Sequence, residues 1–156
     1  MRPALAVLGS LIAACASPTP FQPAERGADG YRVERTEQDH FHIAFYGNSS
    51  TSLRQVEDNL AYLAAQVTLR NGADYFIVAN DRSDRTTSYA YLDSYRDPYL
   101  QCCHWRGVTY HEYEASADIV IRQGAVPQDD PAAHDARAVV EELAPRIKRG
   151  SGHSVY

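Results

Sequence analysis

Cysteine and histidine side chains gather in the middle of the sequence, and they are the residues best suited to chemistry. Cys102 and Cys103 are adjacent, His104 follows directly, and His111 comes seven residues after His104. Thiolates and imidazoles are ligands that suit zinc or copper. The adjacency of the two cysteines does not fit a tight zinc site, because such sites usually separate paired cysteines by about two to four residues.

The same cluster has two further interpretations. In an oxidising periplasm, Cys102 and Cys103 would form a strained vicinal disulfide or would pair with another chain. The other interpretation is a pair of unpaired thiols without a role. The choice between these interpretations and metal binding depends on the compartment, so the N-terminal sequence has to be interpreted first.

Motifs of known enzyme classes are missing from the sequence. It contains no GxSxG, no HExxH and no glycine-rich phosphate loop after a strand. The acidic pairs Glu141-Glu142 and Glu112/Glu114 fit solvated surfaces. A cysteine nucleophile needs a base beside it in an electropositive setting, which sequence adjacency to His104 does not ensure. We therefore expect no catalytic residue and a protein that is not an enzyme.

Composition limits the class of protein. The chain has 156 residues, 44% of them hydrophobic, which fits one globular domain. Fifteen Lys and Arg stand against 20 Asp and Glu, so no surplus of positive charge exists to bind nucleic acid. Eleven tyrosines argue against a disordered acidic protein.

The N-terminus has the layout of a signal peptide. Arg2 supplies one positive charge, and residues 4–14 form an uncharged apolar run of eleven residues. A membrane-spanning helix needs about 20 apolar residues, so this run is too short for a permanent anchor. A first helix of a cytosolic domain would show a polar face, and this run has only Ser10. We therefore predict a signal peptide over residues 1–14.

The sequence Leu11-Ile12-Ala13-Ala14-Cys15 resembles the lipobox of bacterial lipoproteins. The resemblance implies that Cys15 carries diacylglycerol and an acylated amine, such as a palmitate amide, and that its lipid anchors the chain in a membrane. Ala16 after the cysteine is similar to the sorting signal for the outer membrane of Gram-negative bacteria. The alternative is ordinary cleavage near Ala14 or Ala16, which would release a soluble protein with a free thiol.

The pattern of the remaining sequence predicts an α+β fold, with strands and helices in the order ββαββα. Residues 15–29 are expected to be a proline-rich tether, residues 30–149 a single domain, and residues 150–156 a frayed tail. Such an order suits a two-layer sandwich of a mostly antiparallel sheet with two helices on one face.

Periodicity defines the first half of this domain. Residues 31–35 and 40–46 are predicted strands joined by a hairpin through 36–39, and His40 and His42 would point to the same face. Ser52 with Gln55 predicts a capping box, and Asn71-Gly72 predicts the helix end. The apolar stripe of this helix consists of Leu53, Val56, Leu60, Leu63 and Val67.

The second half is less regular. Residues 74–79 read as a buried central strand, and residues 80–107 as either a functional excursion or an extended hairpin. Their tyrosines suggest a recognition surface for a glycan or protein, or aromatic side chains of a hairpin. A second helix is predicted after a cap at Asp135, with an apolar face formed by Ala136, Val139, Val140, Leu143 and Ile147. Pro145 should kink or end this helix.

Several short motifs resemble one family over nearly the whole mature chain. They are the lipobox, Gly30-Tyr31, Phe45-Tyr46-Gly47-Asn48-Ser49, Leu69-Arg70-Asn71-Gly72, Asp74-Tyr75-Phe76 and Asp135-Ala136-Arg137. Together they are similar to a Caulobacter-type family of small uncharacterised alphaproteobacterial lipoproteins. The resemblance implies no catalytic residue.

We therefore expect a lipoprotein of the cell envelope, held at the outer membrane and facing the periplasm. Its domain would have a non-enzymatic binding or structural role, with the membrane and an envelope protein or glycan as partners, no nucleic acid, and no cofactor besides the lipid on Cys15. The alternative is a metal- or thiol-handling periplasmic protein that uses Cys102, Cys103, His104 and His111.

Overall fold

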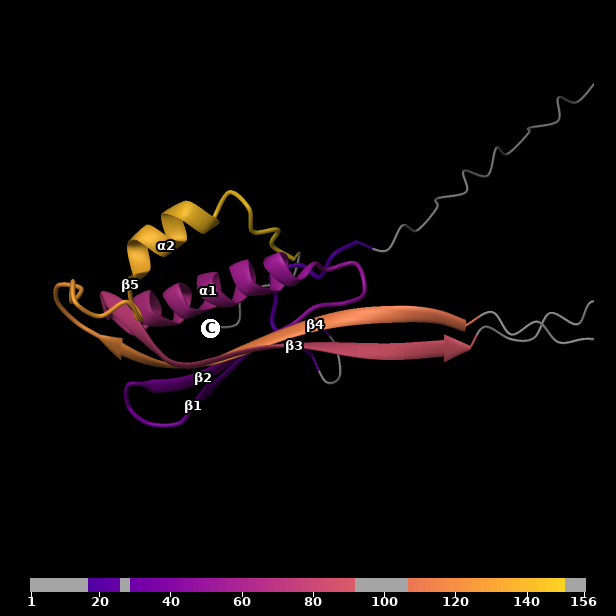
Figure 1. Cartoon of the computed structure of the whole chain (residues 1–156). Coiled ribbons are helices and arrows are strands. Elements are labelled where there is room, and N and C mark those ends of the chain that lie inside the picture. Colours follow the sequence, from indigo (N-terminus) through magenta and orange to yellow (C-terminus); the bar gives the residue numbers. More distant parts are fainter. Residues whose placement is uncertain (1–16, 26–28, 92–106, 151–156) are drawn as a thin grey trace, which may run out of the picture.

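The computed structural model describes residues 17–25, 29–91 and 107–150 (Figure 1). A five-stranded antiparallel sheet has the strand order β1-β2-β4-β3-β5, and Figure 1 shows both helices on the same side of it. The elements are β1 Gly30–Arg35, β2 His40–Tyr46, α1 Leu53–Arg70, β3 Tyr75–Tyr91, β4 Gly107–Arg122, β5 Ala133–Asp135 and α2 Ala136–Leu143. The predicted α+β class is confirmed.

The predicted element order needs one correction, because a short strand, β5, lies between β4 and α2. It pairs only with the start of β3, Tyr75 opposite Asp135 and Ile77 opposite Ala133. Three residues are too few to show the alternation that identifies a strand in sequence. The central strand is also β4, whereas the run at 74–79 predicted that role for β3.

Helix α1 follows its sequence signals closely. The Ser52 side chain accepts a hydrogen bond from the Gln55 backbone, and the Gln55 side chain bonds back to the cap. The helix ends at Asn71, and Gly72 takes a left-handed backbone with a φ of 72°. The predicted apolar stripe is buried except for Leu53, whose exposed fraction is 38%.

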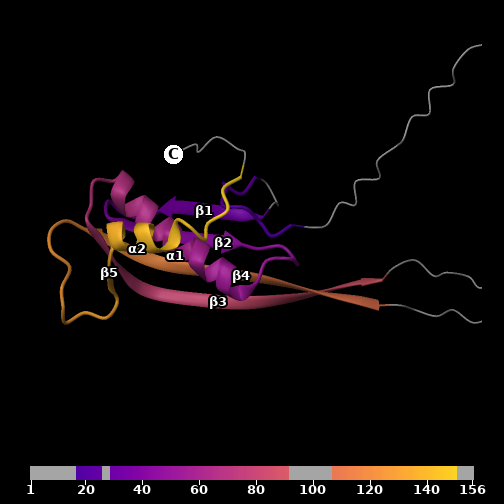
Figure 2. The same ribbon diagram turned by 90° about the horizontal axis from the view of Figure 1, so that it is seen from above.

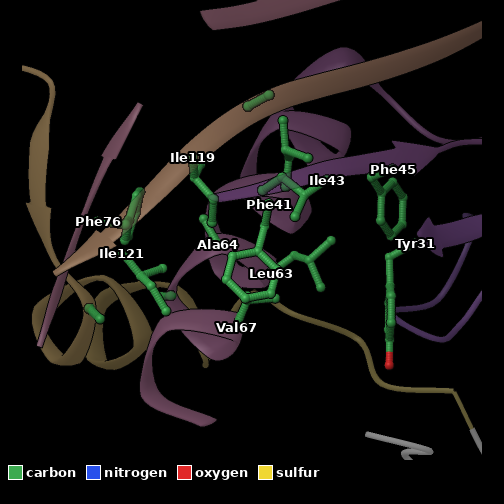
Figure 3. Packing of buried hydrophobic residues seen from close by; sticks show 14 of the residues in the cluster. Tyr31, Phe41, Ile43, Phe45, Leu63, Ala64, Val67, Phe76, Ile119 and Ile121 are labelled. Carbon is green, nitrogen blue, oxygen red and sulfur yellow. The ribbon is translucent and has the colours of Figure 1, made fainter. Parts of the chain in front are cut away.

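The core lies between α1 and the inner face of the sheet (Figure 3). Alternate residues of the three long-paired strands point toward the helix, as period two requires. They pack against Leu63, Ala64 and Val67 of α1. The strand residues labelled in Figure 3 include Phe41, Ile43, Phe45, Phe76, Ile119 and Ile121. The opposite face of the sheet carries polar side chains such as His42 and Asp118.

Residues 80–91 and 107–113 form a hairpin extension, the second of the two interpretations of this stretch. β2 ends opposite Glu114, so beyond that point only β3 and β4 continue, as a two-stranded ribbon (Figure 1). A bulge interrupts the β3–β4 register between Val78 and Asn80. Residues 92–106 lie outside the described part of the chain.

The segment expected to be a tether packs against the domain from Thr19 to Pro23. Thr19 is buried. Phe21 forms a bridge with Arg149 and an edge-to-face contact with Tyr62, with 5.1 Å between ring centroids. Pro23 forms a bridge with Tyr31 at the edge of β1. The prolines led us to expect a free tether, and they gave no sign that the apolar and hydroxyl side chains between them are held by the domain.

Helix α2 begins at its predicted cap, because the Asp135 side chain accepts a hydrogen bond from the Ala138 backbone. It ends at Leu143, before Pro145, so Ile147 lies outside the helix although the apolar pattern placed it there. In the described ranges, no helix is long and apolar enough to cross a membrane. Residues 1–14 and 151–156, the predicted signal peptide and most of the predicted tail, lie outside these ranges.

Asp74 ties α2 to the sheet. Its carboxylate accepts hydrogen bonds from the Gly124 backbone at 2.9 Å and from Arg137 Nη1 at 3.2 Å, while its carbonyl accepts one from the Ala136 backbone. The Gly124 backbone N–H is the main cause that lowers the pKa of Asp74, and the Arg137 guanidinium adds to it against partial desolvation. The ionised carboxylate therefore holds three segments together.

Candidate functional site

The predicted Cys/His cluster falls mostly outside the described residues. Cys102, Cys103 and His104 lie there, as does Cys15, so the structure gives no geometry for metal binding, disulfide formation or lipidation. His111 is exposed on β4, in the two-stranded ribbon. Among residues 17–25, 29–91 and 107–150, no three His, Cys, Asp or Glu side chains are grouped to hold a metal ion.

His40 and His42 point to the same, outer face of β2, as their spacing predicted. His42 Nδ1 lies 2.7 Å from Asp118 Oδ1 on β4, and His40 Nδ1 lies 2.8 Å from Asp39 Oδ1. Asp39 also pairs with Arg122. Each imidazole therefore has a carboxylate partner on a solvated surface, and the His42–Asp118 pair joins β2 to β4.

A hollow of about 370 Å³ lies beside the first turns of α1. Its walls come from the segment after Ser17, from the start of α1 and from the chain after α2. The lining residues are Pro18, Thr19, Ser52, Arg54, Gln55, Asp58, Asn59, Arg146, Ile147 and Lys148. We call this set the basic hollow.

Hydrogen bonds hold the walls of the basic hollow in place. The Thr19 backbone donates to Thr51 Oγ1 at 2.8 Å, and the Asn48 backbone donates to Thr19 Oγ1 at the same distance. The Phe21 backbone donates to the Lys148 carbonyl at 2.7 Å. Segments far apart in sequence thus meet at the start of α1, which makes the hollow a fixed feature of the fold.

Positive charge exceeds negative charge in this hollow. Arg54, Arg146 and Lys148 face Asp58 as the single lining carboxylate. Arg146 lies 3.7 Å from Asp58, which offsets that carboxylate. Arg54 and Lys148 have no ion pair within the described part of the chain. Two positive charges therefore remain unmatched in a protein whose net charge is -5.

Asn59 is the most unusual group of the hollow. Its exposed fraction is only 6%, and its Oδ1 atom has no hydrogen-bond partner. A buried polar atom without a partner costs about 1–3 kcal/mol, so native proteins rarely keep one without a reason. A side-chain amide can both donate and accept. Asn59 therefore points to a ligand with hydrogen-bonding groups of its own.

The helix adds to the same electrostatic field. α1 has 18 residues, and the positive end of its dipole lies at Ser52 on the rim of the hollow. Helix N-termini and arginine side chains are the groups that bind phosphate in proteins. The basic hollow can therefore hold an anion, and phosphate with a hydrogen-bonding substituent fits both its charge and the Asn59 amide.

Sequence reasoning missed this site, although one signal was present. Pro145-Arg146-Ile147-Lys148-Arg149 carries three positive charges in five residues of an acidic chain. Of this run, only Pro145, as a kink or end of the second helix, and Ile147, as part of its apolar face, enter the sequence prediction. Arg149 does not join the lining residues, because its Nη2 donates to Tyr62 Oη at 2.7 Å.

A second hollow of about 300 Å³ lies on the other side of α1, between this helix and β3. Its floor is apolar, with Leu60, Phe76 and Ile119 among the lining residues, and Glu57 and Asp81 stand at its rim. Ser83 Oγ donates to Glu57 Oε1 at 3.5 Å across it. We call this the α1–β3 groove. Its charged lining residues are two carboxylates and one guanidinium, that of Arg82, so it lacks the excess of positive charge found in the basic hollow.

Comparison of the chain with models of protein families, with curated proteins and with solved structures finds no match. The function of the two hollows is therefore inferred from their own residues.

Proposed function

We propose that this protein is a lipid-anchored cell-envelope protein with a non-enzymatic binding domain, and that the domain binds phosphate esters in the basic hollow. In this proposal Cys15 carries the lipid, and the domain faces the periplasm from the outer membrane, as in the lipoprotein family that the sequence resembles. The observation that carries the binding role is the buried, unpartnered amide of Asn59 beside the unmatched charges of Arg54 and Lys148.

The position of the hollow supports a phosphate ester of the membrane itself. Pro18 lines the hollow and comes three residues after Cys15. Three extended residues span at most about 11 Å, so a lipid on Cys15 would keep the hollow close to the headgroups. Basic side chains near an anionic surface each favour binding by about 1 kcal/mol. A glycerophosphate headgroup has the negative charge for Arg54 and Lys148 and the hydroxyls for Asn59.

Mass analysis of the native protein tests the anchor. The intact mass of the protein extracted from membranes is expected to match a chain that starts at Cys15 and carries diacylglycerol and an amide-linked acyl chain. A Cys15→Ser variant is the matched control, because it removes the sulfur and should leave no acylated species. A native chain that starts at Ala16 or later without acyl mass would contradict the anchor.

Binding to headgroups is tested separately, with the lipidated protein in neutral detergent. Titration with glycerol 3-phosphate, inorganic phosphate and glycerol is followed by NMR or calorimetry. We expect glycerol 3-phosphate to bind, glycerol not to bind, and the double variant Arg54→Gln, Lys148→Gln to lose about thirtyfold in affinity. The variant Arg32→Gln, Arg137→Gln removes the same charge elsewhere and should keep the wild-type affinity.

Vesicles then distinguish the two sources of phosphate. Protection of a label on Lys148 by phosphatidylglycerol vesicles but not by phosphatidylcholine vesicles would identify the membrane headgroup. Binding of glycerol 3-phosphate without any protection by vesicles would identify a soluble phosphate ester. Equal affinity of wild type and double variant for every probe would refute the site while leaving the lipid anchor intact.

The second candidate function keeps the Cys102, Cys103, His104 and His111 cluster, because thiols and imidazoles in this density suit metal or redox work. Metal analysis of the purified protein, with thiol titration before and after reduction, tests it. Stoichiometric metal that disappears in Cys103→Ser would favour a metal-handling protein over the binding role of the basic hollow.

A further inference from the structure

Strand β3 has an open edge along much of its length (Figure 2). On the side away from β4, β5 pairs only with Tyr75–Ile77, and the Val78 backbone donates to the Ala132 carbonyl at 3.0 Å. Past the bulge at Ala79, residues 79–85 have no strand on that side within the described ranges. Such an edge offers unpaired N–H and C=O groups that another strand can use.

The exposed edge carries an unusual order of charges. Asp81, Arg82, Ser83, Asp84 and Arg85 are all exposed, and none of the four charged side chains has an ion pair within the described residues. Their own sheet does not complement them either. Arg82 lies opposite Ser116, and Asp84 lies opposite Glu114, a like charge.

The order of charges is complementary to itself when this edge of one copy is aligned antiparallel with the same edge of a second copy. With Ser83 opposite the same residue of a second copy, Asp81 lies opposite Arg85 and Arg82 lies opposite Asp84. Each pair occurs twice, because a two-fold axis relates the copies. All directly opposite charges in this stretch are then of opposite sign, which favours strand pairing.

Neighbouring registers lack this match. A shift by one residue in one direction places Asp81 opposite Asp84, and a shift in the other places Arg82 opposite Arg85. Like charges directly opposite each other are destabilising. The charge order therefore selects one register, whereas charges that only protect an edge from other strands need not be self-complementary.

We propose that two copies of this chain pair antiparallel through β3, centred on Ser83, and that their sheets become continuous. The partner is a second copy because the sequence of the edge is complementary to itself. The other edge of the sheet is less open, since Gln22 and Ala24 make backbone hydrogen bonds to Tyr31 of β1. The pairing does not depend on the lipid or on the basic hollow.

Disulfide trapping in cells tests the proposed register in the native envelope. Ser83→Cys is introduced into the full chain together with Cys102→Ser and Cys103→Ser, so that the native pair cannot cross-link copies. Opposite Cβ atoms in an antiparallel pair lie about 4.5–5.5 Å apart, close to the span of a disulfide. We expect a reducible dimer for Ser83→Cys and none for Ser49→Cys, an exposed control outside the edge.

Charge reversal tests the interface itself. Asp81→Arg alone and Arg85→Asp alone each place like charges opposite each other twice, so each should weaken dimerisation about tenfold or more. The double variant Asp81→Arg, Arg85→Asp restores opposite charges and should dimerise like wild type. The two single variants should also pair with each other better than either pairs with itself.

Sedimentation of the lipidated protein in density-matched detergent, with reductant present, measures these affinities without any cross-link. A wild-type protein that stays monomeric at roughly 100 μM, far above the range of a specific dimer of micromolar affinity, would overturn the proposal. A dimer that neither single charge reversal weakens would overturn it as well, because the interface would then lie elsewhere.

Discussion

The basic hollow and the α1–β3 groove lie on opposite sides of the same helix, and they differ in charge and in apolar surface. Arg54, Asp58 and Asn59 face the first, while Glu57 and Leu60 face the second. Successive residues of an α-helix are rotated by about 100° around its axis, so neighbours in sequence can face different surfaces. The net charge of -5 does not reveal the local excess of positive charge in the basic hollow, where three basic side chains face one carboxylate.

The two hollows also differ in how well their polar groups are satisfied. Across the groove, Glu57 accepts a hydrogen bond from Ser83. In the basic hollow, Asn59 Oδ1 stays unpaired in a buried position. The difference indicates that the basic hollow keeps a buried group whose partner would have to come from outside the described chain.

The largest expected effect comes from weakening the packing of α1, the helix that lies between the two hollows. Leu63 is buried in the core below α1, with an exposed fraction of 3%. Leu63→Ala should lower the free energy of unfolding by about 2–5 kcal/mol, because the truncation leaves a cavity. Urea denaturation measures it, and Leu53→Ala, at an exposed position, should cost under about 0.5 kcal/mol. Equal losses in the two variants would mean that α1 does not pack as described.

Replacing Asn59 tests whether its unpaired amide serves ligand binding in the basic hollow or the stability of the fold. Asn59→Leu has a similar size and removes the unpaired oxygen, so the free energy of unfolding should rise by about 1 kcal/mol. Affinity for glycerol 3-phosphate should fall in the same variant. Thermal denaturation and calorimetry on one preparation give both numbers. A loss of stability would show that the amide supports the fold and would remove the main reason to place a ligand there.

The cap of α1 affects the basic hollow more than the groove. Ser52→Ala removes the side chain that accepts from the Gln55 backbone and should cost about 1 kcal/mol. Its effect on amide exchange should be greatest at the first turn, beside the basic hollow. Ser49→Ala, in the exposed turn before the helix, is the control and should change neither stability nor exchange.

The smallest expected effect is at Asp74, far from the basic hollow. Because its pKa is lowered in the folded protein, the ionised form contributes stability above the ordinary pKa of an aspartate, and this contribution is lost as pH falls below about 4 toward the lowered value. Asp74→Asn should therefore lose less stability than wild type between pH 6 and pH 3 in urea denaturation. Asp129→Asn, on an exposed loop, should follow the wild-type pH dependence.

Local signals in the sequence predicted most of the elements correctly. The Ser52–Gln55 capping box, the Asn71-Gly72 helix end and the Asp135 cap act within a few residues, so their pattern is visible in one stretch of chain. β5 was not predicted, because it is short and is defined by its pairing with β3. Long-range pairing, and hence which strand is central, has no such local signature.

The candidate sites were predicted poorly for the same reason. The basic hollow joins Thr19, Arg54 and Lys148, which are far apart in sequence, and long-range hydrogen bonds of Thr19 and Phe21 hold its walls together. Neither the proline-rich segment nor the positive run after Pro145 indicates that the two meet. The Cys102–Cys103 cluster stood out in sequence because its residues are adjacent, and it remains a prediction.

The hydrogen bonds around Thr19 have a mechanical consequence if Cys15 holds the chain to a membrane. A pull on the anchor would first load the hydrogen bond from Asn48 Nδ2 to the Ser17 carbonyl. It would then load the bonds that join Thr19 to Thr51 and Asn48, and next the one that joins Phe21 to Lys148. These bonds lie at the start of α1, away from the open edge of β3. Tension from the envelope would therefore act first on the turn before α1, and only later on Gln22 and Ala24, whose backbone hydrogen bonds join this segment to Tyr31 of β1.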